Sequence, residues 1–129
     1  MRLAYVDTSC YVAIAFGEPG WNEMAERLLE FDELISANLL EAELRAAFSR
    51  EAVLFDPSFL AGLSWIFPDR SLGREIASVL GAGYIRGADL WHLAAALYVA
   101  EAPARIWFLT LDERQREVAE LLGFQTNLD

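Results

Sequence analysis

Short apolar runs alternate with amphipathic segments along the chain, and the two patterns predict different elements. Four apolar runs predict strands, at residues 3–6, 33–36, 63–67 and 106–109. Amphipathic or alanine-rich stretches predict helices, at residues 8–16, 21–31, 38–50, 72–80, 88–101 and 113–122. Residues 57–63 predict a helical turn, and residues 124–126 a last strand-like stretch. Strands that alternate with helices form βαβ units, so we predict an α/β fold with a central parallel sheet in a three-layer α/β/α sandwich.

Length and composition fit one compact domain over residues 1–129, because a chain that is 55% hydrophobic can bury a substantial core. No stretch approaches the roughly 18–20 apolar residues of a membrane span. The N-terminus lacks the basic flank and long apolar stretch of a signal peptide. We therefore expect a cytoplasmic protein that does not enter a membrane.

Cysteine and histidine are so scarce that they limit the metal chemistry. The one cysteine, Cys10, excludes an internal disulfide, and its apolar neighbours favour a role as a core side chain. One histidine and one cysteine cannot build a zinc site of the usual nitrogen and sulfur type. Any metal must be held by oxygen atoms.

The formal net charge of −10 disfavours a protein that binds nucleic acid by general attraction to phosphate. Such an acidic chain favours a basic partner, a site that holds cations, or simply solubility. The positions of the individual acids decide among these.

Two predicted strands end in an aspartate. Asp7 follows the first strand and Asp112 follows the strand at 106–109. The carboxyl ends of parallel strands border one crevice, so both side chains are expected there. Each has an alternative role as a helix cap, and residues 112–115 match a capping box with a carboxylate in place of the hydroxyl.

Glu43 lies on the apolar face of its predicted helix. Its neighbours three and four residues away are all apolar: Leu39, Leu40, Ala46 and Ala47. An unpaired carboxylate on such a face is costly, so Glu43 is a functional candidate, with a buried arginine pair as the alternative. Glu41 instead has Arg45 one turn ahead, which indicates a surface ion pair.

Asp89 begins a hydrophobic helix whose first turn must border the interior, although capping is again an alternative. His92, three residues later, lies close to the same face. Because it has no partner of its kind, we interpret His92 as a satisfied core or rim residue rather than a ligand.

Together these acids predict one metal-binding crevice. Clustered carboxylates repel one another, and a divalent cation relieves that repulsion. Ligation by oxygen atoms alone, with several retained waters, is typical of Mg²⁺ or Mn²⁺. Such ions serve in phosphodiester hydrolysis, where they activate water and stabilise the leaving oxygen.

Four sequence blocks carry a resemblance to a known family, at Tyr5–Ser9, Ser36–Leu44, Ile85–Ala94 and Phe108–Asp112. In this order and over nearly the whole chain, they resemble the signature blocks of PIN-domain ribonucleases. The closest resemblance is to the VapC-type toxins of toxin–antitoxin pairs.

The resemblance implies a PIN-like fold and a Mg²⁺- or Mn²⁺-dependent endoribonuclease that hydrolyses RNA without a covalent intermediate. The implied metal ligands and catalytic acids are Asp7, Glu43, Asp89 and Asp112. Ser9 and Thr110 would support them, and three arginines near the blocks are candidates for holding the RNA backbone: Arg45, Arg50 and Arg86. Each arginine has an ordinary surface or ion-pairing role as its alternative. The family also implies a homodimer and a cognate antitoxin protein that covers the pocket.

Two other functions remain open at this stage. A PIN-like domain could serve as a catalytically silent binding or scaffold module, but such a module has no reason to keep repelling carboxylates together. A phosphatase with an aspartate nucleophile needs a second aspartate two residues after the first, where this chain has Ser9.

Overall fold

Four parallel strands form the centre of the computed structural model, which describes residues 1–126. Their bounds are β1 (Leu3–Val6), β2 (Glu33–Ala37), β3 (Leu63–Ile66) and β4 (Ile106–Leu109). They lie in the order β3-β2-β1-β4. Tyr5 pairs with Ile35 on one side and with Phe108 on the other. Residues 127–129, at the end of the expected domain, lie outside the described residues.

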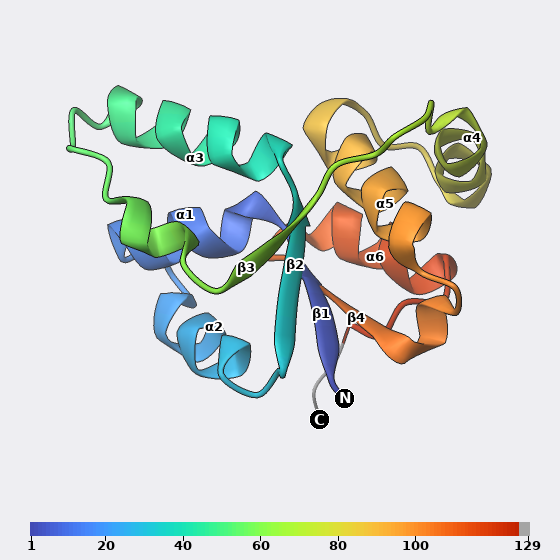
Figure 1. Cartoon of the computed structure of the whole chain (residues 1–129), viewed down its shortest axis with the longest axis horizontal. Helices are drawn as coiled ribbons and strands as arrows, with labels where there is room; N and C mark the ends of the chain where they lie inside the picture. Colours follow the sequence, from blue (N-terminus) through green and yellow to red (C-terminus); the bar gives the residue numbers. More distant parts are fainter. Residues whose placement is uncertain (127–129) are drawn as a thin grey trace.

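Helices cover both faces of the sheet, and this confirms the predicted three-layer α/β/α fold. Figure 1 shows α1 (Thr8–Phe16), α2 (Trp21–Leu28) and α3 (Leu39–Arg50) on one side of the strands. On the other side lie α4 (Gly73–Ala82), α5 (Gly87–Val99) and α6 (Glu113–Leu121). Short 3₁₀ helices span Pro57–Leu60 and Pro103–Arg105. No helix in the described part of the chain is long and apolar enough to cross a membrane.

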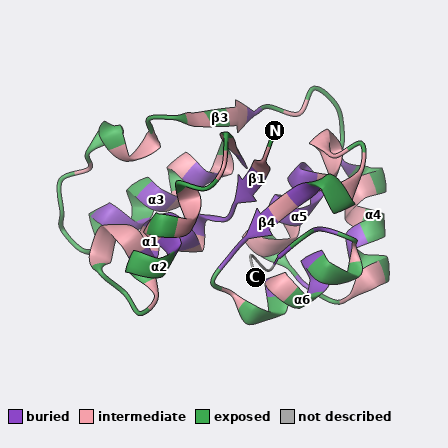
Figure 2. Cartoon of the chain, turned by 90° about the horizontal axis from the view of Figure 1, so that it is seen from below, coloured by how far each residue is buried: buried purple, intermediate pink, exposed green. Residues whose placement is uncertain are grey.

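The pleat of the strands divides the core into two clusters. Tyr5 and Phe108 point towards α4, α5 and α6, whereas Ala4, Val6 and Leu109 point towards α1, α2 and α3. Figure 2 shows that buried residues concentrate on β1, β4 and the helix surfaces turned towards them. Strands buried on both faces read as continuous apolar runs, which explains why the runs were recognisable in the sequence.

Several element ends differ from the predicted ones. The helix predicted over residues 21–31 ends at Leu28, because two turn bonds (from the Leu29 and Glu30 N–H groups) redirect the chain and Phe31 packs edge-on against Trp107. The helix predicted over residues 72–80 continues through Gly81 to Ala82. The stretch 124–126 forms a single parallel bridge, from Gln125 to Trp107, rather than a strand.

The order of the strands in the sheet determines where a ligand site can form. The chain runs from β1 outward through β2 to β3, and then returns to add β4 on the other side of β1. As a result, the helices that follow β1 and β4 leave the sheet on opposite faces (Figure 1). Such a reversal opens a crevice at the carboxyl ends of the two strands, where open parallel sheets bind their ligands.

Candidate active site

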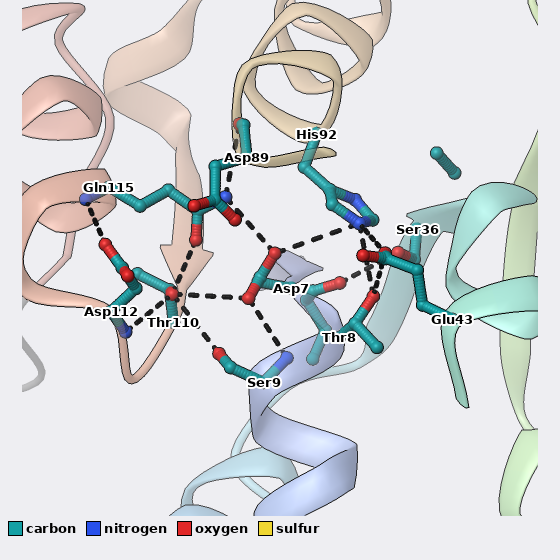
Figure 3. Close-up of polar contacts among 12 residues, drawn as sticks. Asp7, Thr8, Ser9, Ser36, Glu43, Asp89, His92, Thr110, Asp112 and Gln115 are labelled. Atoms are coloured by element: carbon teal, nitrogen blue, oxygen red, sulfur yellow. Dashed lines mark hydrogen bonds and ion pairs between the residues drawn. The ribbon is translucent and has the colours of Figure 1, made fainter. Parts of the chain in front are cut away.

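Asp7 lies at the centre of the polar cluster beyond β1 and β4 (Figure 3). It is the N-cap of α1, and its Oδ2 accepts a hydrogen bond from the Ser9 backbone N–H at 3.0 Å. Its Oδ1 accepts a second from the Gln115 amide, at 3.1 Å. The side chain is almost fully buried, at 4% exposure, so these donors offset the cost of removing the charge from water. Asp7 is thus both a helix cap and part of the crevice.

Gln115 ties α6 to this cluster from the other strand end. Its Oε1 accepts from the Thr110 hydroxyl at 2.6 Å, and that hydroxyl accepts from the Asp112 N–H at 3.0 Å. The Asp112 carboxylate caps α6 through the Gln115 N–H at 2.7 Å. Half of the predicted capping box therefore forms, but the Gln115 side chain turns inward to Thr110 and Asp7 instead of back to the cap.

The Ser9 hydroxyl, unlike its backbone N–H, supports the loop after β4 rather than a carboxylate. Its hydroxyl accepts from the Leu111 N–H at 3.1 Å and lies 3.3 Å from the Thr110 hydroxyl. Thr110 itself lies 3.4 Å from Asp7 Oδ2, a longer contact than its bond to Gln115. The two predicted supporting hydroxyls therefore contact each other, and they hold the β4 end against the start of α1.

Glu43 reaches the same cluster from α3. Its Oε1 accepts hydrogen bonds from the Thr8 hydroxyl and from His92 Nε2, both at 2.7 Å. Its partners are therefore a hydroxyl and an imidazole, not the arginine of the alternative interpretation. Partial burial opposes ionisation of Glu43, but the hydrogen bonds from His92 and Thr8 outweigh it and lower the pKa of the carboxyl. Glu43 is held as a carboxylate.

Asp89 lies in the first turn of α5 and does not cap it. The helix begins at Gly87, and the cap residue Arg86 makes no side-chain capping bond, so the alternative cap role of Asp89 is wrong. Partial burial, together with repulsion from Asp7 and Asp112, raises the pKa of the Asp89 carboxyl. The Asp89 carboxylate therefore shares one electrostatic environment with the aspartates of both strand ends.

One open groove unites the four predicted acids. Its lining includes Asp7, Glu43, Asp89 and Asp112, and its volume is about 910 Å³. Of the three arginines predicted for RNA, only Arg50 lies in this lining. Arg45 instead pairs with Glu41 at 2.7 Å and lies over the Phe55 ring.

The acids converge without forming a closed cage. Within residues 1–126, no three His, Cys, Asp or Glu side chains lie close enough together to hold a metal ion directly. Their chemistry nevertheless fits a hard cation that is bound partly through water, because every available ligand atom is an oxygen and Asp89 is destabilised by its acidic neighbours.

Comparison with protein families decides the identity of the fold. The PIN domain model matches residues 4–121, which include all four acids. The chain belongs to the PIN domain family. PIN domains are generally nucleases that use divalent metals such as Mg²⁺, so the family supports a hydrolase that acts on nucleic acid. No curated protein and no solved structure matches this PIN domain.

Sequence reasoning missed two parts of this PIN-domain site. The pattern of residues 112–115 predicts only a capping role for Gln115, although Gln115 shares one helix face with Val118, Ala119 and Leu122, a phase that indicates burial. The bond between His92 Nδ1 and the Tyr5 hydroxyl joins residues 87 positions apart, and no local pattern signals it.

Proposed function

We propose that this PIN domain is a Mg²⁺- or Mn²⁺-dependent endoribonuclease. The observation that carries the proposal is the groove at the carboxyl ends of β1 and β4, where four carboxylates from four segments meet. A charge cluster of this kind is destabilising by itself and becomes favourable when a cation neutralises it. The family match supports hydrolysis of nucleic acid as its use.

The residues divide into cation-holding and water-orienting roles. Asp7, Asp89 and Asp112 would hold the cation or its waters, and Glu43 would hold it or orient the attacking water. A divalent cation supplies charge neutralisation at the phosphate and favours ionisation of a nearby water. Mg²⁺ keeps several of its own waters, which suits carboxylates that approach one groove without forming a cage.

The protein prepares the groove for a phosphodiester in two ways. Backbone and amide donors hold the Asp7 carboxyl in one position. Thr8 and His92 hold one oxygen of Glu43, which leaves the other oxygen for the attacking water. Water would add to phosphorus while the bond from phosphorus to one flanking oxygen breaks, and no covalent bond to the protein forms.

We further propose that the nuclease is the toxin of a toxin–antitoxin pair and acts in the cytoplasm, as a homodimer. The net charge of −10 suits a basic antitoxin segment that covers the acidic groove. The expected result is growth arrest when the wild type is expressed alone, relieved by Asp7→Asn and by co-expression of the protein encoded immediately upstream.

The nuclease activity is tested with purified protein and both single-stranded and structured RNA, in Mn²⁺, Mg²⁺ or chelator. Asp7→Asn is the central variant, because asparagine is as good a helix cap as aspartate but removes the charge. Glu43→Gln is compared with Glu41→Gln, which lies two residues away in an ion pair outside the groove.

Cleavage that needs the added cation, falls at least about 100-fold in Asp7→Asn and Glu43→Gln, and persists in Glu41→Gln supports the proposal. Equal cleavage by the wild type and Asp7→Asn contradicts it, as does cleavage that persists in chelator. If the wild type neither cleaves RNA nor binds divalent cations, the domain is a catalytically silent binding or scaffold module.

A further inference from the structure

The chain's one histidine lies completely buried between the sheet and the acidic groove. His92 comes from α5, and Figure 3 shows its ring turned towards Glu43 and Thr8. Its partner on the sheet side, Tyr5 of β1, is also fully buried. Both polar side chains therefore occupy the core at a position where an apolar pair would pack at lower cost in desolvation.

A continuous line of hydrogen bonds runs from the sheet to the groove through these two side chains. The Ala37 backbone N–H donates to the Tyr5 hydroxyl at 3.1 Å. The Tyr5 hydroxyl lies 2.6 Å from His92 Nδ1, and His92 Nε2 lies 2.7 Å from Glu43 Oε1. We call Tyr5 and His92, connected in this way, the Tyr5–His92 bridge.

The donors and acceptors of the bridge favour one direction for its hydrogen bonds. A backbone N–H can only donate, so the Tyr5 oxygen accepts from Ala37 and its own hydrogen is available to His92 Nδ1. Burial raises the pKa of the Tyr5 phenol well above its usual value, which keeps that hydrogen in place. An imidazole that accepts at Nδ1 carries its hydrogen on Nε2, the atom that faces Glu43.

Aromatic packing immobilises the bridge. The Tyr5 ring stacks on Phe108 with an interplanar angle of 5° and a centroid distance of 5.2 Å. The His92 ring meets Tyr5 edge-on, at 5.7 Å and 72°. Neither ring can rotate without losing these contacts, so the Nε2 donor has a fixed position relative to β1.

The Glu43 carboxylate accepts hydrogen bonds through only one of its two oxygens, within the described residues. Both of its donors, Thr8 and His92 Nε2, contact Oε1, and no contact to Oε2 is found among the described residues. The Glu43 side chain is 30% exposed and lines the groove. Asp7 Oδ1 is the other carboxylate oxygen near Nε2, but at 3.8 Å it lies beyond hydrogen-bond distance.

We propose that Tyr5 and His92 are positioning residues, which hold Glu43 by Oε1 so that Oε2 is presented to the groove in one orientation. The bridge ties the carboxylate on α3 to the sheet that carries Asp7. This inference rests on the proposed nuclease function, because it assigns the bridge to the water-orienting acid of that site. It predicts an effect of Tyr5 on turnover although Tyr5 touches no substrate.

The hydrogen positions can be read directly, because the chain has only one imidazole. Nitrogen-15 NMR of histidine-labelled protein is expected to show a hydrogen on His92 Nε2, the atom that faces Glu43. A ring that carries no hydrogen on Nε2 overturns the bridge, because it cannot donate to Glu43. This measurement does not depend on nuclease activity, so failure of the bridge and failure of the proposed function are distinguishable.

The positioning role is tested by turnover on RNA in Mn²⁺. Tyr5→Phe removes only the hydroxyl and is expected to lower kcat about tenfold with KM unchanged. The matched control is Tyr11→Phe, which removes the hydroxyl of a buried tyrosine in the cluster on the opposite face of the sheet. All rates are measured well below the thermal midpoint of each variant, so that folding does not contribute.

A second pair of variants separates the role of His92 in positioning Glu43 from its role in packing the core. His92→Gln keeps an amide donor for Glu43, whereas His92→Leu keeps the volume and loses the donor. We expect His92→Gln to retain several-fold more kcat than His92→Leu. An unchanged kcat in Tyr5→Phe, or equal losses in the two His92 variants, overturns the positioning role.

Discussion

At the scale of single residues, three of the four acids of the groove differ in how the protein surrounds their charge. Asp7 is buried and receives hydrogen bonds from a backbone N–H and from Gln115. Glu43 is stabilised by a hydroxyl and an imidazole, which lower its pKa. The pKa of Asp89 is raised by its partial burial and its acidic neighbours. Between Glu43 and Asp89, Asp89 is therefore the acid whose charge more needs a cation.

Asp89→Asn is expected to stabilise the metal-free protein at neutral pH, because it removes a carboxylate that partial burial and repulsion from Asp7 and Asp112 disfavour. The expected rise in thermal midpoint is about 2–4 °C, measured by calorimetry in chelator. The folded state binds the Asp89 proton more tightly than the unfolded chain, so Asp89 costs stability as the pH rises through its raised pKa. The advantage of the variant should therefore shrink as the pH falls.

Added Mn²⁺ should reverse the order of thermal stability of the wild type and Asp89→Asn. The wild type is expected to gain thermal stability with Mn²⁺, and Asp89→Asn to gain much less. A matched control is Asp56→Asn, whose carboxylate caps a 3₁₀ helix outside the groove. Equal Mn²⁺ stabilisation of the wild type and Asp89→Asn would contradict a role for Asp89 in holding the cation.

At the scale of elements, the site depends on how α6 and α5 dock against the sheet. Gln115 of α6 is fully buried, and it joins Thr110, Asp7 and the Asp89 carbonyl, contacts that span three elements. Loss of that one amide should loosen the docking of α6.

Gln115→Leu is expected to lower the free energy of unfolding by about 1–3 kcal/mol, because the Thr110 hydroxyl and Asp7 lose buried partners. Urea unfolding measures the change. Gln125→Leu, at an exposed glutamine bonded to a single carbonyl, should stay within about 0.5 kcal/mol of the wild type. Equal free energies of unfolding for the two variants would show that the hydrogen bonds of Gln115 with Thr110 and Asp7 do not contribute to stability.

Two glycines of different helices should respond oppositely to the same substitution. Gly17 ends α1 with φ of +63°, so Gly17→Ala should cost about 1 kcal/mol. Gly81 lies inside α4 with open space around it, so Gly81→Ala should stabilise the protein by about 0.5–1 kcal/mol. Urea unfolding of both variants gives the sign of each change in the free energy of unfolding. Changes of the same sign would contradict the assigned helix ends.

Those elements could be predicted from the sequence whose signal lies in the pattern of neighbouring residues. Strands buried on both faces appear as apolar runs, and the aspartates that follow β1 and β4 could be placed at one crevice before the structure was known. Helical phase alone made Glu43 a functional candidate, with a buried arginine pair as the alternative. The start of α5 could not be predicted from the sequence, because Asp89 resembles a helix cap. In the structure the helix begins at Gly87. Likewise, the inward turn of the Gln115 side chain depends on contacts with Asp7, Thr110 and Asp89, which are distant from it in sequence or lie on other segments.

At the scale of the whole molecule, the acidity limits how RNA can bind. A net charge of −10 opposes a broad phosphate-binding surface, so affinity must come from the cation site and a few local cations. Arg50 is the one predicted RNA-binding arginine in the groove lining. Its exposed pair with Glu51, at 3.3 Å, is weak enough to exchange for a phosphate.

Arg50→Ala is expected to raise KM for RNA about fivefold and leave kcat near the wild-type value. It should also reduce the slope of log affinity against log salt by about 0.7, the value for one phosphate contact on a single strand. Arg45→Ala is the comparison, since Arg45 is engaged by Glu41 and Phe55. Equal effects of the two variants would mean that the RNA path crosses α3 outside the groove.

The most direct test of the central claim is a crystal of the protein soaked with Mn²⁺ and measured at a wavelength where manganese scatters anomalously. The account predicts an anomalous peak in the groove, bound directly or through water by Asp7, Asp89 and Asp112. The peak should be absent or much weaker in Asp89→Asn crystals treated identically. A groove without a peak at saturating Mn²⁺, or a peak of equal height in Asp89→Asn, would contradict a metal-dependent site built from these acids.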